Sequence, residues 1–140
     1  MIWNANTTGS TKPGAFVLLR IALGLVAGCL WAPAAMAAGD PKAGADIFSA
    51  ECSECHSVKE GRHKKGPSLF AVLGRKAASL PDVNYSDALR TSGWVWNEQT
   101  LRAYLSKPAK EANPGGKMKY DGLKDERALG SVIEYLGTNR

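Results

Sequence analysis

The residues with the clearest chemical potential are two cysteines and a histidine within five consecutive positions. Cys52 and Cys55 are separated by two residues and His56 follows directly, which makes the pattern C-x-x-C-H. Two thiols with this spacing can form thioether bonds to the two vinyl groups along one edge of a haem, and the pattern is the attachment signature of c-type haem. The adjacent imidazole is then directed at the iron. The motif predicts one covalently attached haem c, with His56 as a metal ligand.

Two other chemistries use a C-x-x-C pair. Zinc would require further ligands, and after the N-terminal region no other cysteine or paired histidine offers one. A thioredoxin-like dithiol would require alternating strands and helices, and no such pattern surrounds Cys52 and Cys55. Both alternatives remain weaker than haem attachment.

The second axial ligand of the iron is expected to be Met118. Met1 and Met36 lie in the N-terminal region, so Met118 is the only methionine of the remaining chain. A lone methionine usually fills a core, but Met118 lies in the Pro- and Gly-rich segment 113–122 instead of an apolar helical stripe. Coordination by His and Met raises the reduction potential. It also occupies both axial positions, which favours electron transfer over catalysis.

His63 is the alternative axial ligand. It lies among Arg62, Lys64 and Lys65, and a basic loop of this kind is usually solvated. We therefore expect a surface histidine. Ligation by two histidines, which would lower the potential, stays open as the alternative.

Residues 1–37 are expected to form a cleavable export signal. Lys12 and Arg20 are the only charged residues there, positions 21–30 are almost wholly apolar, and Ala35-Met36-Ala37 supplies small residues for a signal peptidase. Cleavage would leave residues 38–140 as one domain in the periplasm. Export agrees with the haem motif, because haem is attached to such thiols outside the cytoplasm.

Two other fates of the N-terminal region stay open. Val26-Ala27-Gly28-Cys29 is similar to a lipobox, which would make Cys29 a lipidated N-terminus. Residues 21–38 are also just long enough to remain as a membrane anchor facing the periplasm.

Composition indicates a globular protein whose net charge produces no strong electrostatic field. Hydrophobic residues make up 44% and charged residues 22% of the 140 residues, which excludes disorder. The formal net charge is +5, and removal of Lys12 and Arg20 with the signal lowers it to +3. Any electrostatic docking must therefore come from an uneven placement of lysines. We expect a monomer that binds no nucleic acid.

Helical patterns dominate, and no convincing alternating strand pattern is present, so an all-α fold is predicted. Helices are expected over residues 40–53, 86–91, 97–106 and 125–136. Pro41 suits a first helical turn, Asn97 an N-cap and Gly137 a C-cap. Long loops separate these helices, so few apolar residues remain to form a core. A large apolar cofactor would complete it.

Taken together, these residues resemble class I cytochrome c, close to the mitochondrial and soluble bacterial kind. The resemblance covers about residues 39–137 and rests on Cys52–His56, Gly66-Pro67-Ser68-Leu69, Gly74-Arg75-Lys76, Tyr85-Ser86-Asp87-Ala88, Trp96, Leu101, Tyr104-Leu105, Pro114-Gly115-Gly116-Lys117-Met118 and Tyr135-Leu136. It implies about four to five short helices and loops wrapped around one covalently bound haem. The first and last helices would cross, with Gly44 and Phe48 against Val132 and Tyr135.

The resemblance also implies roles around the haem. The Pro67 carbonyl would accept a hydrogen bond from His56, which fixes the ring as a ligand, and Tyr104 would approach Met118. A buried haem propionate needs donors, and the residues expected to supply them are Arg75, Tyr85 and Trp96. For Tyr85 and Trp96, ordinary aromatic packing is the alternative.

Two positions depart from the family pattern. Gly116 stands where threonine is common, which would loosen the loop that holds Met118. Tyr120 stands where phenylalanine is usual beside the haem edge.

The resemblance implies a one-electron carrier, not an enzyme. Expected partners are quinol–cytochrome c oxidoreductase as donor and a terminal oxidase as acceptor in a respiratory chain, or photosynthetic equivalents. Docking would use lysines around an exposed haem edge: Lys64, Lys65, Lys117, Lys119 and Lys124. The membrane would be reached only through these partners. A membrane-tethered subunit of a larger complex and, less favoured, a haem peroxidase are the alternatives.

Overall fold

The computed structural model describes residues 39–140. The expectations for the N-terminal region, namely the export signal over residues 1–37, the lipobox at Cys29 and the anchor over 21–38, lie outside the described residues. Within residues 39–140, none of the helices combines the length and apolar character that a bilayer crossing requires.

Regular structure in the described chain is helical. The elements are α1 (Pro41–Ile47), the π-helical turn η1 (Phe48–Cys52), α2 (Asp87–Arg90), α3 (Glu98–Leu105), α4 (Ala109–Ala112) and α5 (Glu126–Thr138). A single isolated β-bridge joins Lys76 and Val95 in this part of the chain. The prediction of an all-α fold of a few short helices is confirmed.

Side-chain caps explain where the longer helices begin. Asn97 accepts a hydrogen bond from the Thr100 N–H at 2.8 Å, as the sequence predicts for the start of α3. Asp125 accepts one from the Ala128 N–H at 2.9 Å at the start of α5. Each cap satisfies a backbone donor that the first helical turn leaves unpaired.

The first predicted helix does not stay α-helical to its end. After α1 the backbone widens into η1, in which the Ser53 N–H donates to the Phe48 carbonyl at 2.9 Å. The N–H groups of Cys55 and His56 then both donate to the Cys52 carbonyl, at 3.1 and 2.9 Å. Single π-helical turns of this kind often occur at functional sites, and this one leads directly into the C-x-x-C-H motif.

The predicted end of the last helix is wrong by two residues. Gly137 lies inside α5, and the cap is Asn139. A Cβ at position 137 would lie 2.9 Å from Leu73 Cδ1, so the glycine makes room for a packed neighbour instead of ending the helix.

The short helix α4 was not predicted. Pro108 follows the end of α3 and stands at the N-cap of α4. A proline is compatible with a helix start because the first turn does not need its missing N–H.

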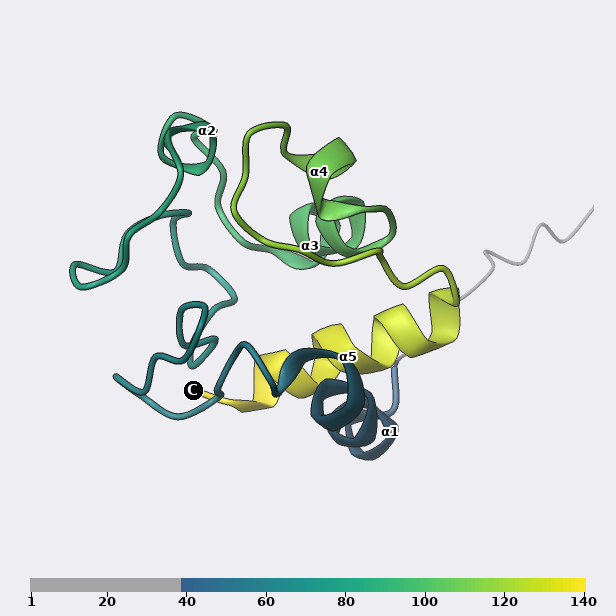
Figure 1. Cartoon of the computed structure of the whole chain (residues 1–140). Helices are drawn as coiled ribbons and strands as arrows, with labels where there is room; N and C mark the ends of the chain where they lie inside the picture. Colours follow the sequence, from purple (N-terminus) through teal and green to yellow (C-terminus); the bar gives the residue numbers. More distant parts are fainter. Residues whose placement is uncertain (1–38) are drawn as a thin grey trace, which may run out of the picture. The chain divides into compact units, whose positions relative to one another are not determined.

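The crossing of α1 and α5 is the most extensive helix–helix contact among the described residues (Figure 1). Figure 1 shows α1 nearly end-on beside α5. A Cβ at Gly44 would overlap the Ser131 carbonyl and lie 2.7 Å from Tyr135 Cβ, so only glycine allows this approach. The rings of Phe48 and Tyr135 lie 5.5 Å apart, centroid to centroid. The predicted helix crossing is confirmed.

The core lies along the inner face of α5. Leu129, Val132, Ile133 and Leu136 are buried there, with Leu129 fully inaccessible to solvent. The same cluster takes in Phe48 from η1, Val72 from a loop and Leu101 from α3. One side of this cluster is also the wall of the cavity described next.

Candidate cofactor site

A cavity of ≈ 520 Å³ lies between α5, α3 and the long loops. That volume is in the range of small-molecule and cofactor sites. Much of the lining is apolar and comes from Leu69, Val72, Leu101, Leu105, Val132 and Leu136. The cavity brings together all nine residues predicted for the site: Cys52, Cys55, His56, Pro67, Arg75, Tyr85, Trp96, Tyr104 and Met118.

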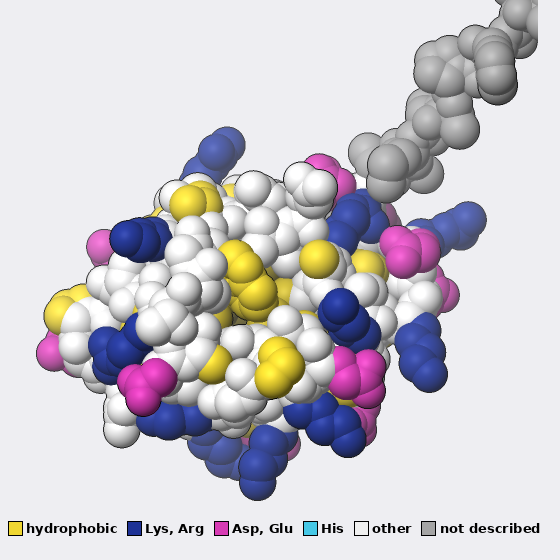
Figure 2. Space-filling view, turned by 90° about the horizontal axis from the view of Figure 1, so that it is seen from above, with side chains coloured by type: hydrophobic (Ala, Val, Ile, Leu, Met, Phe, Trp, Pro, Cys, Tyr) yellow, Lys and Arg dark blue, Asp and Glu magenta, His cyan; other side chains and the backbone are white. Residues whose placement is uncertain are grey.

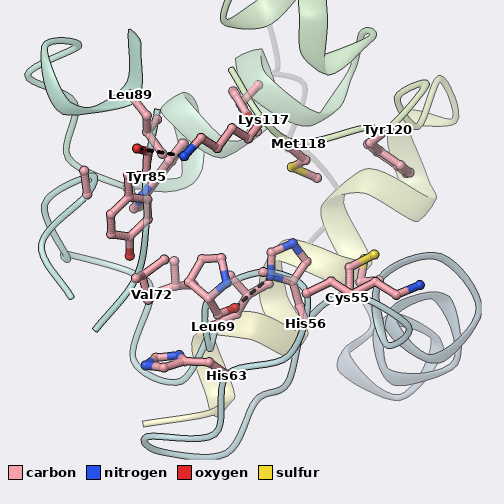
Figure 3. Close-up of a pocket in the computed structure, with 18 of the residues that line it drawn as sticks. Cys55, His56, His63, Leu69, Val72, Tyr85, Leu89, Lys117, Met118 and Tyr120 are labelled. Carbon is pink, nitrogen blue, oxygen red and sulfur yellow. Dashed lines mark hydrogen bonds between the residues drawn. The ribbon is translucent and has the colours of Figure 1, made fainter. Parts of the chain in front are cut away.

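His56 is oriented by a hydrogen bond to the backbone. Its Nδ1 lies 2.8 Å from the Pro67 carbonyl oxygen (Figure 3). Because a carbonyl can only accept, Nδ1 is the donor, and a neutral ring then keeps the lone pair on Nε2. Burial lowers the pKa of His56 more strongly than the Pro67 bond raises it, and the charge of Lys64 lowers it further. The imidazole is therefore neutral at pH 7 and available as a ligand.

Gly66 allows the imidazole to lie against the chain. A Cβ at position 66 would lie 2.5 Å from His56 Cε1. The Gly66 N–H also donates to the Cys55 carbonyl at 2.8 Å, which ties this loop to the cysteine motif. Its position directly before Pro67 is the only sequence feature that marks Gly66 as part of the site.

The two cysteines of the motif are unpaired thiols that line the cavity. Burial, together with the charges of Glu51 and Cys55, raises the pKa of Cys52 to about 11. Within residues 39–140 no three His, Cys, Asp or Glu side chains are grouped to hold a metal ion. The pair therefore lacks further zinc ligands in this part of the chain.

Met118 and His56 face the cavity from different sides. Figure 3 shows the Met118 sulfur across the open space from the His56 ring. His63 accepts a hydrogen bond from the Ser68 N–H at 3.0 Å through its Nδ1. It lies beyond Leu69, away from Met118 (Figure 3). His63 is thus partly buried and bonded, in contrast to the solvated side chain that the sequence predicts.

The loop before Met118 is tied down by Lys117. The Lys117 ammonium donates to the carbonyl and side-chain oxygens of Asn84, at 3.0 and 2.9 Å, and to the Tyr85 carbonyl at 3.3 Å. The prediction treats Lys117 as a free docking charge, whereas the structure gives it three partners across the mouth of the cavity. These bonds hold the loop that Gly116 would otherwise loosen.

Aromatic rings pack closely at the α3 side of the cavity. The centroids of Trp96 and Tyr104 lie 5.2 Å apart, and Trp94 lies 5.8 Å from each of them in edge-to-face geometry. Burial raises the pKa of Tyr104. The sequence pattern marks Trp96 and Tyr104 but not Trp94.

Arg75 both stabilises a loop and lines the cavity. Its guanidinium donates to the carbonyls of Phe70 at 2.7 Å and Ser68 at 2.8 Å, which holds that loop in place. It also lines the cavity beside Tyr85. Burial lowers the pKa of Arg75, and the nearby Tyr85 raises it. Burial raises the pKa of Tyr85, and the charge of Arg75 lowers it.

The residues around the cavity fit a haem. Two unpaired thiols stand beside a neutral imidazole, a thioether lies opposite, and apolar side chains cover the remaining wall. One buried side-chain donor, Asn113 Nδ2, has no hydrogen-bond partner within the described protein, and Asn113 also lines the cavity. Arg75 and Tyr85 add polar groups to the apolar wall.

Comparisons with known proteins agree with this fit. A family model described as cytochrome c matches residues 41–139. A cytochrome c from Gibberella zeae is 43% identical over 102 residues, which cover 72% of this chain and 95% of that protein. A cytochrome c from Theileria annulata is 46% identical over 99 residues, 70% of this chain and 84% of that protein. A cytochrome c2 from Rhodomicrobium vannielii is 42% identical over 113 residues, 80% of this chain and 89% of that protein.

Proposed function

This chain belongs to the cytochrome c family, and we propose on that premise that it is a periplasmic one-electron carrier with His56 and Met118 as the axial iron ligands. The family carries electrons and is not a family of enzymes, and it binds one covalently attached haem c. Haem supplies a one-electron Fe(III)/Fe(II) couple.

The observation that carries the ligand assignment is the placement of two donors on different sides of one cavity. His56 Nε2 is free because Nδ1 is used by Pro67. That bond strengthens the imidazole as a ligand and stops the ring from rotating. Met118 lies opposite on a loop that Lys117 anchors. Fixed ligands require little rearrangement when an electron arrives, which supports fast transfer.

The polar end of the cavity supports the predicted binding of haem carboxylates. Arg75, Tyr85 and Trp96 all line it. Arg75 retains N–H donors beyond the two that hold the Ser68 and Phe70 carbonyls, because a guanidinium carries five. A carboxylate bound there would lie near the Arg75 cation and the neutral hydrogen-bond donors of Tyr85 and Trp96.

Cytochromes of this family work outside the cytoplasm, and the N-terminal pattern favours the periplasm for this chain. We expect the protein purified from its native membrane-free fraction to begin at Ala38 and to carry one haem mass that survives acid–acetone extraction. Intact-protein mass spectrometry measures both. A lipidated Cys29 or a retained N-terminal region would instead establish a tethered electron-transfer subunit. Loss of the pigment on extraction would contradict covalent attachment.

Redox complexes are the partners that the family implies, and we infer docking through lysines at the cavity mouth. Of the five lysines predicted for this role, Lys64, Lys65, Lys117 and Lys119 line the cavity, and Lys124 does not. Figure 2 shows one face of the molecule, with apolar side chains in a central hollow and both basic and acidic side chains around its margin. The proposed partners are a quinol–cytochrome c oxidoreductase as donor and a terminal oxidase as acceptor.

The lining lysines are not equally free to meet a partner. Lys64 donates to the Ser53 carbonyl, and Lys65 forms an exposed ion pair with Glu54. Lys117 holds the Asn84 loop. Lys119 is exposed and makes no side-chain hydrogen bond within residues 39–140. Lys119 is therefore the cleanest probe of docking.

Lys119→Gln is expected to slow oxidation by a terminal oxidase about two- to threefold at low salt, because one steering charge is lost. The difference from the wild type should vanish above the ionic strength at which surface charges are screened. Stopped-flow oxidation across a salt series measures this. Lys42→Gln, on the exposed side of α1, is the matched control and should leave the rate unchanged. Equal slowing by both variants, or none by Lys119→Gln, would contradict docking at the cavity mouth.

A further inference from the structure

The cysteine side of the cavity mouth carries lysines whose charges are already balanced by acids. Lys65 forms an ion pair with Glu54, which stands between the two cysteines, and Lys64 donates to the Ser53 carbonyl. The pairing acts on both partners, because Lys65 lowers the pKa of the Glu54 carboxyl and Glu54 raises the pKa of the Lys65 ammonium. Glu51 adds a second exposed carboxylate on this side and lines the cavity. The formal charges of these two lysines and two glutamates therefore sum to zero.

Glu51 is the unpaired acid of the cysteine side. Its carboxylate takes part in no ion pair within residues 39–140. Burial raises the pKa of Tyr120 to about 12, and the charges of Cys52 and Glu51 contribute to that shift. Glu51 therefore lies near the Tyr120 ring, at the place where the Met118 segment approaches the cysteine motif. An exposed carboxylate in this position is available to a basic group of another molecule.

A second cavity lies on the other side of the Met118 segment. It has a volume of ≈ 310 Å³ and is lined by Pro108, Lys110, Met118, Lys119, Tyr120 and Asp121. Met118, Lys119 and Tyr120 also line the first cavity, so this short stretch of chain separates the two. A molecule seated in the second cavity would contact Met118, the proposed axial ligand, from outside.

The charges of the second cavity are not balanced. Lys110 and Lys119 are exposed, and neither ammonium has an ion-pair partner in the described part of the chain. Asp121 is the one acid in the lining, so two cations against one anion leave a formal charge of +1. Pro108 and Tyr120 are half-buried and add apolar surface beside these charges. A carboxylate suits this cavity because it would meet two ammonium groups that the protein itself does not use.

We propose that the docking surface is divided by charge: an acidic group of the redox partner enters the second cavity between Lys110 and Lys119, and a basic group of the same partner meets Glu51. The partner therefore carries both signs of charge on its docking face. Such a division fixes the orientation of the complex, because a partner that is turned around would bring like charges together. Figure 2 shows acidic as well as basic side chains around the hollow of one face. This inference rests on the electron-carrier function proposed above and refines its docking surface.

Inert paramagnetic ions test both halves of the surface directly. The probes are the anion hexacyanochromate(III) and the cation tris(ethylenediamine)chromium(III), each added to the reduced wild-type holoprotein at low ionic strength, where surface charges are least screened. The anion should broaden the amide signals of Lys110 and Lys119, and the cation should broaden that of Glu51. Equal broadening by the anion at Lys65 and Lys119 would overturn the proposal, and so would a cation that leaves the Glu51 signal sharp.

Variants that remove one charge test the same division by kinetics. At low salt, Lys119→Gln should slow oxidation by the anion hexacyanoferrate(III) about twofold, and Glu51→Gln should slow oxidation by the cation tris(phenanthroline)cobalt(III) about twofold. Glu134→Gln, on the exposed side of α5 and outside both cavities, is the matched control for Glu51→Gln and should change neither rate. A Glu51→Gln protein that reacts with the cation at the wild-type rate would contradict the proposal.

The ion pair of the cysteine side provides the contrast with a uniform ring of lysines. Glu54→Gln combined with Lys65→Gln removes both charges of the pair, and it should change the hexacyanoferrate(III) rate less than Lys119→Gln alone. An equal or larger slowing would mean that Lys65 attracts the anion, which would overturn the division by charge. Failure of the proposed function has a different signature, because Lys119→Gln would then leave oxidation by the terminal oxidase unchanged whatever the inorganic ions do.

Discussion

Replacing Met118 with alanine is expected to lower the midpoint potential by on the order of 0.1–0.3 V, a fraction of the ~0.8 V over which axial ligands set haem potentials. The neutral thioether stabilises ferrous over ferric iron, so its loss favours the oxidised state. The absorption band that arises from thioether ligation should disappear as well. Redox titration followed by visible spectroscopy measures both. The cavity wall and the His56 side should be unaffected, so the haem should stay attached.

His63→Ala is the matched control for Met118→Ala. His63 also lines the cavity, but its Nδ1 is engaged by the Ser68 N–H. We expect its removal to leave the potential and the thioether band unchanged. If His63→Ala changed the visible spectrum and the midpoint potential while Met118→Ala left both unchanged, His63 would be the second ligand. That result would refute the assignment of Met118.

Gly44→Val is expected to lower the melting temperature of the holoprotein by about 15 °C. A Cβ at this position overlaps the Ser131 carbonyl and lies 2.7 Å from Tyr135 Cβ, so α1 must move away from α5. Forcing extra atoms into a packed core costs about 1–3 kcal/mol or more. In a domain of about 100 residues, each kcal/mol shifts the midpoint by about 4–8 °C. Differential scanning calorimetry measures the change.

The control for Gly44→Val is Lys42→Val, which places the same side chain on the exposed side of α1. It introduces the same β-branched residue into the helix without meeting α5, and should shift the midpoint by at most a few degrees. Gly44→Ala should fall between the two. If the Gly44→Val protein had the same melting temperature as the wild type, α1 and α5 would not approach each other this closely.

Several features could be predicted because they depend on short sequence separations. The C-x-x-C-H motif needs only five consecutive residues, and the predicted cap Asn97 acts on an N–H group three positions away. The buried stripe of α5 repeats with the period of a helix. The errors arose where a distant contact decides the local outcome. Gly137, for example, lies inside α5, where the absence of a side chain leaves room for Leu73 from a distant loop.

By itself, the sequence therefore determined the haem chemistry, the helices and the face of α5 that is buried, since each is written in neighbouring residues. Only the tertiary structure decided which side of the cavity Met118 occupies, and that Lys117 is a tether to Asn84 and Tyr85. These residues stand on irregular loops, where the backbone has no period from which a side-chain direction can be predicted. Their positions follow from contacts between segments dozens of residues apart, which form only when the whole chain closes around the cavity.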